Sequence, residues 1–400
     1  MNTRKQATSY LAPSIGLTEI SEMEGRLSNV LDKVRTAMLA PTSEKTAPLL
    51  NISQLSQLCG EDKSKLHYRI KKGDLPAGTL SESKAKRFWS VDEVHEWMAA
   101  YRSEKMRPRD TAPGVTIAVA NFKGGVAKTT TAATLAQGLS LRGHRKILVV
   151  DSDPQGSISE LFSKTPTTVK LEETILPLYQ GTETSLDYAV RPTYWPGIDI
   201  VAASPIVFDA EFALPVRQMN DPSFEFWSVL DEGLNSLREK YDVIIIDTPP
   251  SLSYSTINSL MASDGLVIPI PPNTLDFASS AQFWRLYLDF SEPIKKKRGV
   301  DKHFSFINVL MTRVDNSEAM SGEVRRWILS AYGDSVLPIE IPKTSIASTA
   351  SAEFGTAYDV SDSMASSKTW KRAHDAYERM VDLIEDQIVG IWAYYGKDKK

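Results

Sequence analysis

A stretch rich in lysine, glycine and threonine, NFKGGVAKTTTAATLA at residues 121–136, contains the residue types that bind phosphate. An ordinary phosphate-binding loop has a glycine, four further residues, a second glycine, a lysine and then serine or threonine. Here Phe122 and Ala127 occupy the two glycine positions, ahead of Lys128 and Thr129. An additional lysine, Lys123, follows the first of them. The stretch therefore predicts phosphate chemistry with one more cation than usual.

The neighbouring residues place this stretch between a strand and a helix. VTIAVANF (115–122) is a β-type run, and TTTAATLAQGLSL (129–141) is typical of a helix. The free amides and positive dipole end of a helix N-terminus favour phosphate, whereas a merely structural glycine-rich turn is the alternative. We expect Lys128 to reach the β- and γ-phosphates and Thr129 to ligate Mg²⁺. The predicted nucleotide-binding residues are Lys123, Gly124, Gly125, Val126, Ala127, Lys128, Thr129 and Thr130.

The segment KGGVAKTT resembles the deviant Walker A loop, KGGxxK[ST], of the ParA/MinD family of ATPases. The resemblance implies that Lys123 reaches across a face-to-face dimer to the ATP phosphates of the partner subunit. It also explains why the usual loop pattern is broken, since a second charge is needed at a site that another subunit completes. Ala127 stands where chromosomal relatives have glycine, and a small residue still permits the turn.

Two acidic strand ends fit the same family. KILVVDSDPQGS (146–157) resembles its second motif, which implies that Asp153 positions the attacking water and that Asp151 braces the loop. YDVIIIDTPPSLS (241–253) resembles Walker B and the switch region, which implies that Asp247 holds Mg²⁺ through water and that Thr248, Pro249 and Pro250 sense the γ-phosphate. A carboxylate at a strand end can also be a helix cap. The implied catalytic residues are Lys123, Lys128 and Asp153, and the implied metal ligands are Thr129 and Asp247.

Short β-rich runs alternate with helical patterns from residue 115 onward. The runs are VTIAVANF, KILVVD, IDIVAA, DVIIID, GLVIPI and FSFINVLMT, and the helical segments include residues 128–143 and 226–241. Continuous Val/Ile runs indicate strands that are covered on both faces. We therefore predict an α/β fold with a doubly wound, mostly parallel sheet over residues 114–400, preceded by an N-terminal α-helix and a winged helix-turn-helix.

The 400 residues carry a formal net charge of -4 and 42% hydrophobic residues, which is typical of a globular protein. Because Cys59 is the only cysteine, one chain can form neither an internal disulfide nor a cysteine-based metal cluster. The chain start has no apolar core of the length of a secretion signal, so we expect a cytoplasmic protein. The segment VDLIEDQIVGIWAYY (381–395) has helical apolar spacing but an acidic opposite face, which favours a docking helix over a membrane anchor.

The N-terminal part divides into two predicted regions. Residues 17–40 have apolar side chains at spacings of three, four and seven, which indicates an amphipathic helix without a core of its own. We assign 1–47 to a dimerisation helix and linker. Residues 48–106 form two short helices around a Gly60 turn, followed by a wing and another helix, and resemble a MerR-like winged helix-turn-helix that binds DNA.

Basic residues mark two candidate DNA-binding surfaces. Between residues 63 and 87 there are eight basic residues against two acidic ones, a footprint of phosphate-backbone binding, although a solvated face is the alternative. The candidates here are Lys63, Lys65, Arg69, Lys71, Lys72, Lys84, Lys86 and Arg87. In the ATPase region the resemblance implies non-specific DNA binding by an ATP-bound dimer, with surface ion pairs as the alternative for Arg313, Arg325, Arg326 and Lys343.

Together these features resemble the larger, plasmid-type ParA partition ATPases, including RepA-like partition proteins of repABC replicons. The resemblance implies a homodimer that uses ATP and Mg²⁺, binds nucleoid DNA, is released by a ParB-type partner and represses its own operon at an operator site. Slow ATP hydrolysis would then time a conformational state. The alternatives are a transcription regulator with a nucleotide-sensing domain, a MinD-like membrane ATPase, and a metabolic phosphate-loop enzyme such as a dethiobiotin synthase.

Overall fold

The computed structural model describes residues 15–39, 44–83, 86–143, 145–165, 168–315, 317, 320–343, 355–359 and 368–397. The chain divides into two compact units, Met1–Lys45 and Thr46–Lys400. In the first unit, α1 (Leu17–Leu39) confirms the predicted helix. The apolar side chains that the structure describes on this helix are exposed, with Leu17 86% and Leu27 66% accessible.

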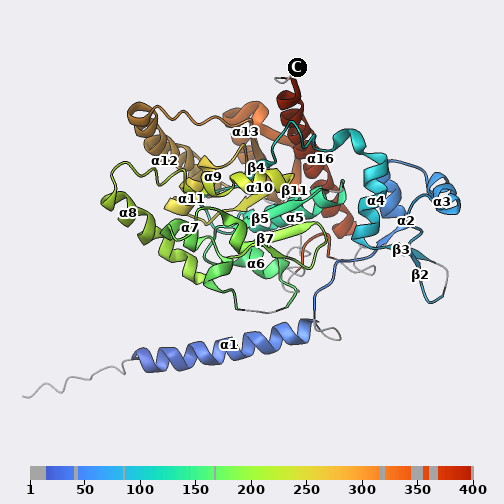
Figure 1. Cartoon of the computed structure of the whole chain (residues 1–400), viewed down its shortest axis with the longest axis horizontal. Helices are drawn as coiled ribbons and strands as arrows, with labels where there is room; N and C mark the ends of the chain where they lie inside the picture. Colours follow the sequence, from blue (N-terminus) through green and yellow to red (C-terminus); the bar gives the residue numbers. More distant parts are fainter. Residues whose placement is uncertain are drawn as a thin grey trace, which may run out of the picture. The chain divides into compact units, whose positions relative to one another are not determined.

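The second unit is built on an eight-stranded sheet with the order β11-β10-β9-β4-β8-β5-β7-β6 (Figure 1). All neighbouring strands run parallel except β6, which pairs antiparallel with β7. This arrangement confirms the predicted α/β class with a mostly parallel sheet. The strands are β4 (Val115–Val119), β5 (Ile147–Asp151), β6 (Arg191–Pro192), β7 (Ile198–Val201), β8 (Val243–Asp247), β9 (Gly265–Ile270), β10 (Phe306–Val314) and β11 (Val336–Pro342).

Alternate side chains of the central strands enter two different cores. Ile117 and Ile245 belong to one apolar cluster, whereas Ala118 and Ile246 belong to the other. Because successive residues of a strand point to opposite faces, both faces of the sheet are covered. The continuous apolar runs of the sequence follow directly from this double burial.

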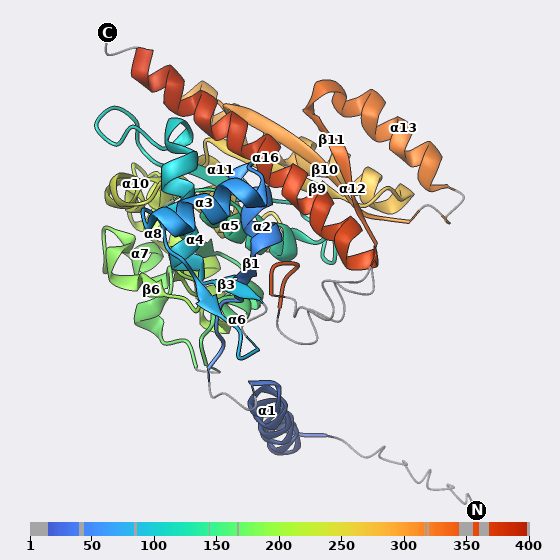
Figure 2. The same ribbon diagram turned by 90° about the vertical axis from the view of Figure 1, so that its right-hand side faces the viewer.

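Helices cover both faces of this sheet (Figures 1 and 2). Residues 226–241, predicted as one helical segment, form two short helices that meet at Gly233 and Leu234. A Cβ on Gly233 would lie 2.5 Å from Leu178 Cδ2, so glycine permits this close packing. The helices are α5 (Lys128–Leu141), α6 (Ser157–Phe162), α7 (Leu176–Gln180), α8 (Ala210–Asn220), α9 (Val229–Gly233), α10 (Asn235–Lys240), α11 (Tyr254–Met261), α12 (Thr274–Arg298), α13 (Ser321–Tyr332) and α16 (Lys368–Lys397).

Residues 50–101 form a small group of helices and strands within the second unit. A three-stranded antiparallel sheet with the order β1-β3-β2 lies beside three helices. Gly60 ends the first of them with a φ of 66°, a left-handed conformation that glycine adopts without strain, as the Gly60 turn requires. The elements are β1 (Leu50–Asn51), α2 (Ile52–Cys59), α3 (Lys63–Lys72), β2 (Thr79–Leu80), β3 (Arg87–Trp89) and α4 (Val91–Tyr101).

The last helix, α16, packs against β11 and α5 (Figure 2). Val381, Ile384 and Ile388, the apolar residues that raised the question of a membrane anchor, are fully buried. Their apolar face therefore serves intrachain docking. In the described part of the chain, no helix has the length and apolarity that a bilayer crossing needs.

Candidate nucleotide site

The predicted phosphate loop connects β4 to α5 at the carboxyl edge of the sheet. Asn121 accepts a hydrogen bond from the Lys123 amide at 3.0 Å and donates one to the carbonyl of Pro269 at 2.8 Å. Gly125 and Ala127 have φ values of 75° and 74°. Ala127 thus adopts the conformation that glycine provides more easily, at a cost of about 1 kcal/mol. Within the described residues, no side chain caps the start of α5, so its amides point into the loop.

Lys128, Thr129 and Asp247 meet at this loop. Lys128 is buried, and its Nζ donates to the carbonyl of Lys123 at 3.0 Å. Thr129 Oγ1 donates to Asp247 Oδ2 at 2.7 Å, while the buried Oδ1 of Asp247 has no hydrogen-bond partner in the described residues. Burial, together with the neighbouring Asp151, raises the pKa of Asp247 well above its usual value. An orphaned carboxylate oxygen beside a threonine hydroxyl fits Mg²⁺, which prefers oxygen ligands.

The two aspartates that follow β5 have different surroundings. Asp151 is fully buried and accepts hydrogen bonds from the Asp153 amide at 3.1 Å and from the Ser159 hydroxyl at 2.6 Å. Burial raises the pKa of Asp151 to about 7. Asp153 Oδ1 accepts only a backbone bond, from Gln155 at 2.9 Å, among the interactions that the structure describes. Asp151 therefore braces the turn, and Asp153 retains acceptor capacity for another group.

Lys123 does not point into the loop that it belongs to. Its Nζ forms an ion pair with Asp276 Oδ1 near the start of α12. Asp276 is 5% exposed, and its amide donates to the capping residue Asn273 at 3.0 Å. In the single chain the extra cation is thus held by a buried carboxylate of the same subunit. Asp276 lies in the NTLD segment after β9, where Asn273 caps the start of α12.

The second candidate DNA surface is divided by the structure. Arg313 Nη1 donates to the carbonyl of Gly125 in the phosphate loop at 2.5 Å, and the Arg313 backbone has a φ of 52°. A non-glycine residue in this region carries strain. Arg325 pairs with Glu340 at 3.1 Å and Lys343 with Asp315 at 3.3 Å, whereas Arg326 is exposed on α13. The four residues therefore do not form one uniform patch.

The basic residues of 63–87 mostly lie on the exposed side of α3 and on the strands beside it. Lys63, Lys71 and Lys86 are exposed. Lys65 pairs with Glu61 at 2.6 Å, and Asp74 pairs with Arg69 at 2.8 Å and Lys72 at 3.8 Å. Arg87 donates to the carbonyls of Ala77 and Gly78 and so supports the turn between α3 and β2. Lys84 lies outside the described residues.

A residue that sequence reasoning missed connects α8 to the predicted switch region. Glu211 accepts from the amides of Tyr254 at 2.9 Å and Ser255 at 3.1 Å, the first residues of α11. Its carboxylate therefore accepts hydrogen bonds from backbone amides that have no partner within the helix. Thr248, in the same region, donates to the carbonyl of Val119 at 3.0 Å. No local pattern around Glu211 indicates this role, since its partners lie more than forty residues away.

A parallel sheet with this loop at its carboxyl edge, the adjacent Lys128 and Thr129, and an acidic strand end beside them define a phosphate-loop nucleoside triphosphatase. Residues 114–297 match the AAA_31 family model, described as an AAA domain. The putative replication protein A of Rhizobium rhizogenes is 30% identical over 392 residues, which cover 94% of this chain and 96% of that protein. The chain belongs to the ParA-type family of plasmid partition ATPases.

Two further relatives are similar to this chain. Protein SopA of Escherichia coli K12 is 27% identical over 361 residues, 88% of this chain and 91% of its own length. The chromosome partitioning protein ParA of Caulobacter vibrioides is 30% identical over 230 residues, 57% of this chain and 80% of its own length. The predicted ParA resemblance is therefore confirmed, and the chain is an ATPase of this family.

Solved structures share the fold. A structure described as a partition protein has a TM-score of 0.66 at 20% identity and covers 94% of this chain and 96% of its own. Cobyrinic acid a,c-diamide synthase from Mycobacterium smegmatis, solved with a bound ATP analog and magnesium, has a TM-score of 0.53 at 27% identity. It covers 68% of this chain and 94% of its own. The first likeness, at its low identity, establishes the fold alone.

Proposed function

We propose that this chain is a Mg²⁺- and ATP-dependent DNA-binding partition ATPase that segregates a plasmid or another low-copy replicon. The observation that carries the proposal is the convergence of Lys128, Thr129 and Asp247 at a helix N-terminus that no described side chain caps. An ATP analog and magnesium in the similar diamide synthase structure support the same ligands here. The predicted division into 1–47, 48–106 and 114–400 remains part of this proposal.

The loop amides and Lys128 would bind the phosphates of ATP. Thr129 and Asp247 would hold Mg²⁺, which neutralises charge on the phosphates when it is bound. Asp153 would orient the attacking water, since its carboxylate has free acceptor capacity near Lys128. Phosphoryl transfer to water requires positioning and charge neutralisation more than covalent help, so these groups suffice for slow hydrolysis.

Lys123 would act on the ATP of a second subunit. To do so it must leave Asp276, so the ion pair of the single chain would be exchanged for a phosphate contact in the dimer. Hydrolysis would thereby be tied to dimerisation. The exposed apolar face of α1, with Leu17, Leu27 and Leu31, is the surface that we assign to additional self-association.

DNA binding would use the basic residues of α3 and its neighbouring strands for an operator site. The exposed residues Lys63, Lys71 and Lys86 suit phosphate contacts. The candidates for binding non-specific DNA are Arg313, Arg325, Arg326 and Lys343. Arg313, Arg325 and Lys343 also have partners within the chain. A ParB-type partner would stimulate hydrolysis and release the protein from the nucleoid, and operator binding would repress its own operon.

Fluorescence anisotropy with a labelled duplex of arbitrary sequence tests the proposal. The titration is run with Mg²⁺ and ATP, ADP or no nucleotide at one fixed salt concentration, because salt governs such affinities. We expect ATP to tighten binding at least about tenfold relative to ADP, which lies within the usual range of allosteric coupling. Lys128→Ala should lose this nucleotide dependence while retaining its circular dichroism spectrum. Equal binding in all three states would contradict the proposal.

A further inference from the structure

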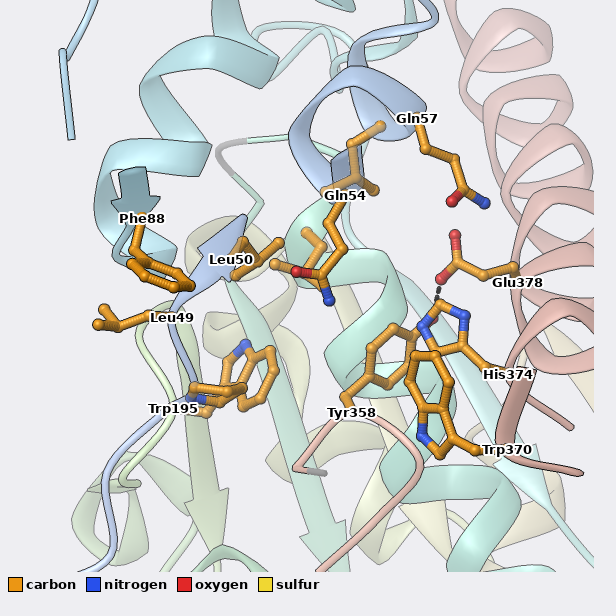
Figure 3. A pocket seen from close by; sticks show the side chains of 13 residues that line it. Leu49, Leu50, Gln54, Gln57, Phe88, Trp195, Tyr358, Trp370, His374 and Glu378 are labelled. Carbon is orange, nitrogen blue, oxygen red and sulfur yellow. Dashed lines mark hydrogen bonds between the residues drawn. The ribbon is translucent and has the colours of Figure 1, made fainter. Parts of the chain in front are cut away.

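A cavity of about 330 Å³ lies far from the phosphate loop, between residues 48–58 and helix α16. Figure 3 shows Leu49, Leu50 and Phe88 on one side of it and Tyr358, Trp370 and His374 on the other. Its lining is mostly apolar, and its volume falls in the range of small-molecule sites, about 300–1,000 Å³. A site of this kind is not needed for ATP binding or for DNA contacts.

The aromatic wall of the cavity is a continuous series of rings. Trp370 stacks on His374 with ring centroids 4.4 Å apart and an angle of 27°. His374 meets Tyr358 edge-on at 5.3 Å, and Tyr358 meets Trp195 edge-on at 6.4 Å. A flat ring fits such a surface better than a branched aliphatic group, since aromatic rings prefer stacked or edge-to-face contacts.

Polar groups are few and most are already engaged. Glu378 accepts from Tyr358 and pairs with Arg142 at 3.0 Å, so its charge is compensated. Burial lowers the pKa of His374, which leaves a neutral imidazole at pH 7. The side chain of Gln54 reaches between Leu50 and Tyr358, and that of Gln57 points toward Glu378 (Figure 3). A charged ligand would lose its hydration here without a free counter-ion, whereas a single hydrogen-bonding group could meet an amide.

One buried donor is left without a partner beside this wall. Nε1 of Trp195 has no hydrogen-bond acceptor among the residues that the structure describes, although Trp195 is only 1% exposed. Buried indole N–H groups are normally paired. An acceptor on a ligand that enters past Leu50 would satisfy this group.

We propose that the cavity is a second ligand site, which takes an uncharged planar aromatic molecule with a hydrogen-bonding group. The cavity is lined by residues from the predicted DNA-binding region and from the ATPase region. Its aliphatic side comes from β1 and α2, next to the proposed DNA-binding helix α3, and Leu141 on its floor is the last residue of α5. Since α5 begins with Lys128 in the phosphate loop, the ligand would contact the other end of a rigid helix of about 21 Å.

Saturation-transfer NMR with indole as the probe tests the site in the full-length protein. We expect a saturable signal that persists with excess ATP and Mg²⁺, because the cavity is separate from the phosphate loop. Leu58→Trp, which fills the cavity from α2, should weaken indole binding at least about tenfold. Ser53→Trp is the matched control, since Ser53 is exposed on the same helix outside the lining, and it should bind indole like the parent chain.

A second variant distinguishes a filled cavity from misfolding of Leu58→Trp. Leu49 is 56% exposed at the rim, so Leu49→Trp should narrow the entrance without disturbing the core and should also weaken binding. The proposal is overturned if indole gives no saturable signal, if ATP displaces it, or if both filled variants bind it as tightly as Ser53→Trp. A crystal structure in which side chains of the protein fill the cavity would overturn it as well. None of these results depends on DNA binding or partition activity.

Discussion

Lys123 of the phosphate loop and Asp276 at the start of α12 form an ion pair within one subunit. The pair holds the extra lysine away from its own phosphate site. If Lys123 serves the partner's ATP, Asp276 competes for it. Asp276→Asn retains the amide and the capping contact with Asn273 but removes the charge. We expect the protein concentration at half-maximal ATP hydrolysis to fall by about fivefold, in line with the energy of one partly exposed ion pair.

The measurement is the initial hydrolysis rate as a function of protein concentration. Lys123→Ala is the companion variant and should lose most of the concentration-dependent rate. If Asp276→Asn raises the protein concentration at half-maximal hydrolysis instead of lowering it, Asp276 organises the active dimer and does not restrain Lys123.

Arg313 connects the loop after β10 to the carbonyl of Gly125. Removing it should loosen the phosphate loop, so we expect Arg313→Ala to raise the Kd for ATP about tenfold or more, the effect of one charge-assisted hydrogen bond. Arg326→Ala is the matched control, because Arg326 is exposed on α13 and does not contact the loop in the described structure. Isothermal titration calorimetry with ATP and Mg²⁺ compares them. Equal ATP affinities would leave Arg313 with a role in DNA binding alone.

The buried aspartates make the folding stability of the nucleotide-free protein depend on pH. Burial raises the pKa of Asp151 to about 7 from 3.8, so the folded state holds this proton more tightly than the unfolded state. The associated stability is full below pH 3.8 and is lost as the pH rises to about 7. Burial is also the main cause of the raised pKa of Asp247. We therefore expect the Tm of the nucleotide-free protein to fall between pH 5 and pH 8, as measured by calorimetry.

Asp247→Asn separates this effect from general pH dependence. Asparagine can still accept the hydrogen bond from Thr129 but carries no charge. Its Tm at pH 8 should exceed that of the parent chain by about 1 °C, equivalent to roughly 1 kcal/mol in a chain of this size. The stabilisation of the protein by Mg²⁺ and ATP should disappear. If the Tm of Asp247→Asn at pH 8 is lower than that of the parent chain, the charge of the buried carboxylate does not destabilise the nucleotide-free protein.

Glu385 on α16 provides a test of the packing that supports the site. Its carboxylate pairs with Arg145 at 2.6 Å, and both side chains are 0% exposed. Glu385→Ala leaves a buried cation unpaired and should cost about 3–5 kcal/mol. The neighbouring Asp386 is 65% exposed and pairs with Lys105 at 2.8 Å, so Asp386→Ala should cost about 1 kcal/mol or less. Urea denaturation measures both, and similar losses would contradict the argument.

Local sequence patterns predict the central strands well because burial on both faces requires continuous apolar runs, as in VIIID of β8. They predict β11 poorly. In VLPIEIP the exposed Glu340 alternates with the buried Ile339 and Ile341, and β11 lies at the edge of the sheet. In this segment the sequence predicts a role only for Lys343, which directly follows β11.

The site shows the same division between local and long-range information. Lys128, Thr129 and the strand-end aspartates are marked by motifs, but the pairing of Lys123 with Asp276 is not. It arises because β4 and β9 are neighbours in the sheet, which brings their carboxyl ends together across about 150 residues of sequence. Strand order is a property of the whole fold, so no local pattern could predict that contact.

In the proposed dimer Lys123 completes the nucleotide site of the other subunit, and mixing two inactive variants tests this arrangement. Lys128→Ala should fail to hold ATP, and Lys123→Ala should bind ATP but fail to hydrolyse it. In mixed dimers, the Lys128→Ala subunit can still supply Lys123 to the intact site of its partner. We predict that an equal mixture recovers about one quarter of the parent rate, as expected for random pairing in a twofold dimer. A mixture as inactive as its components would contradict action across the interface.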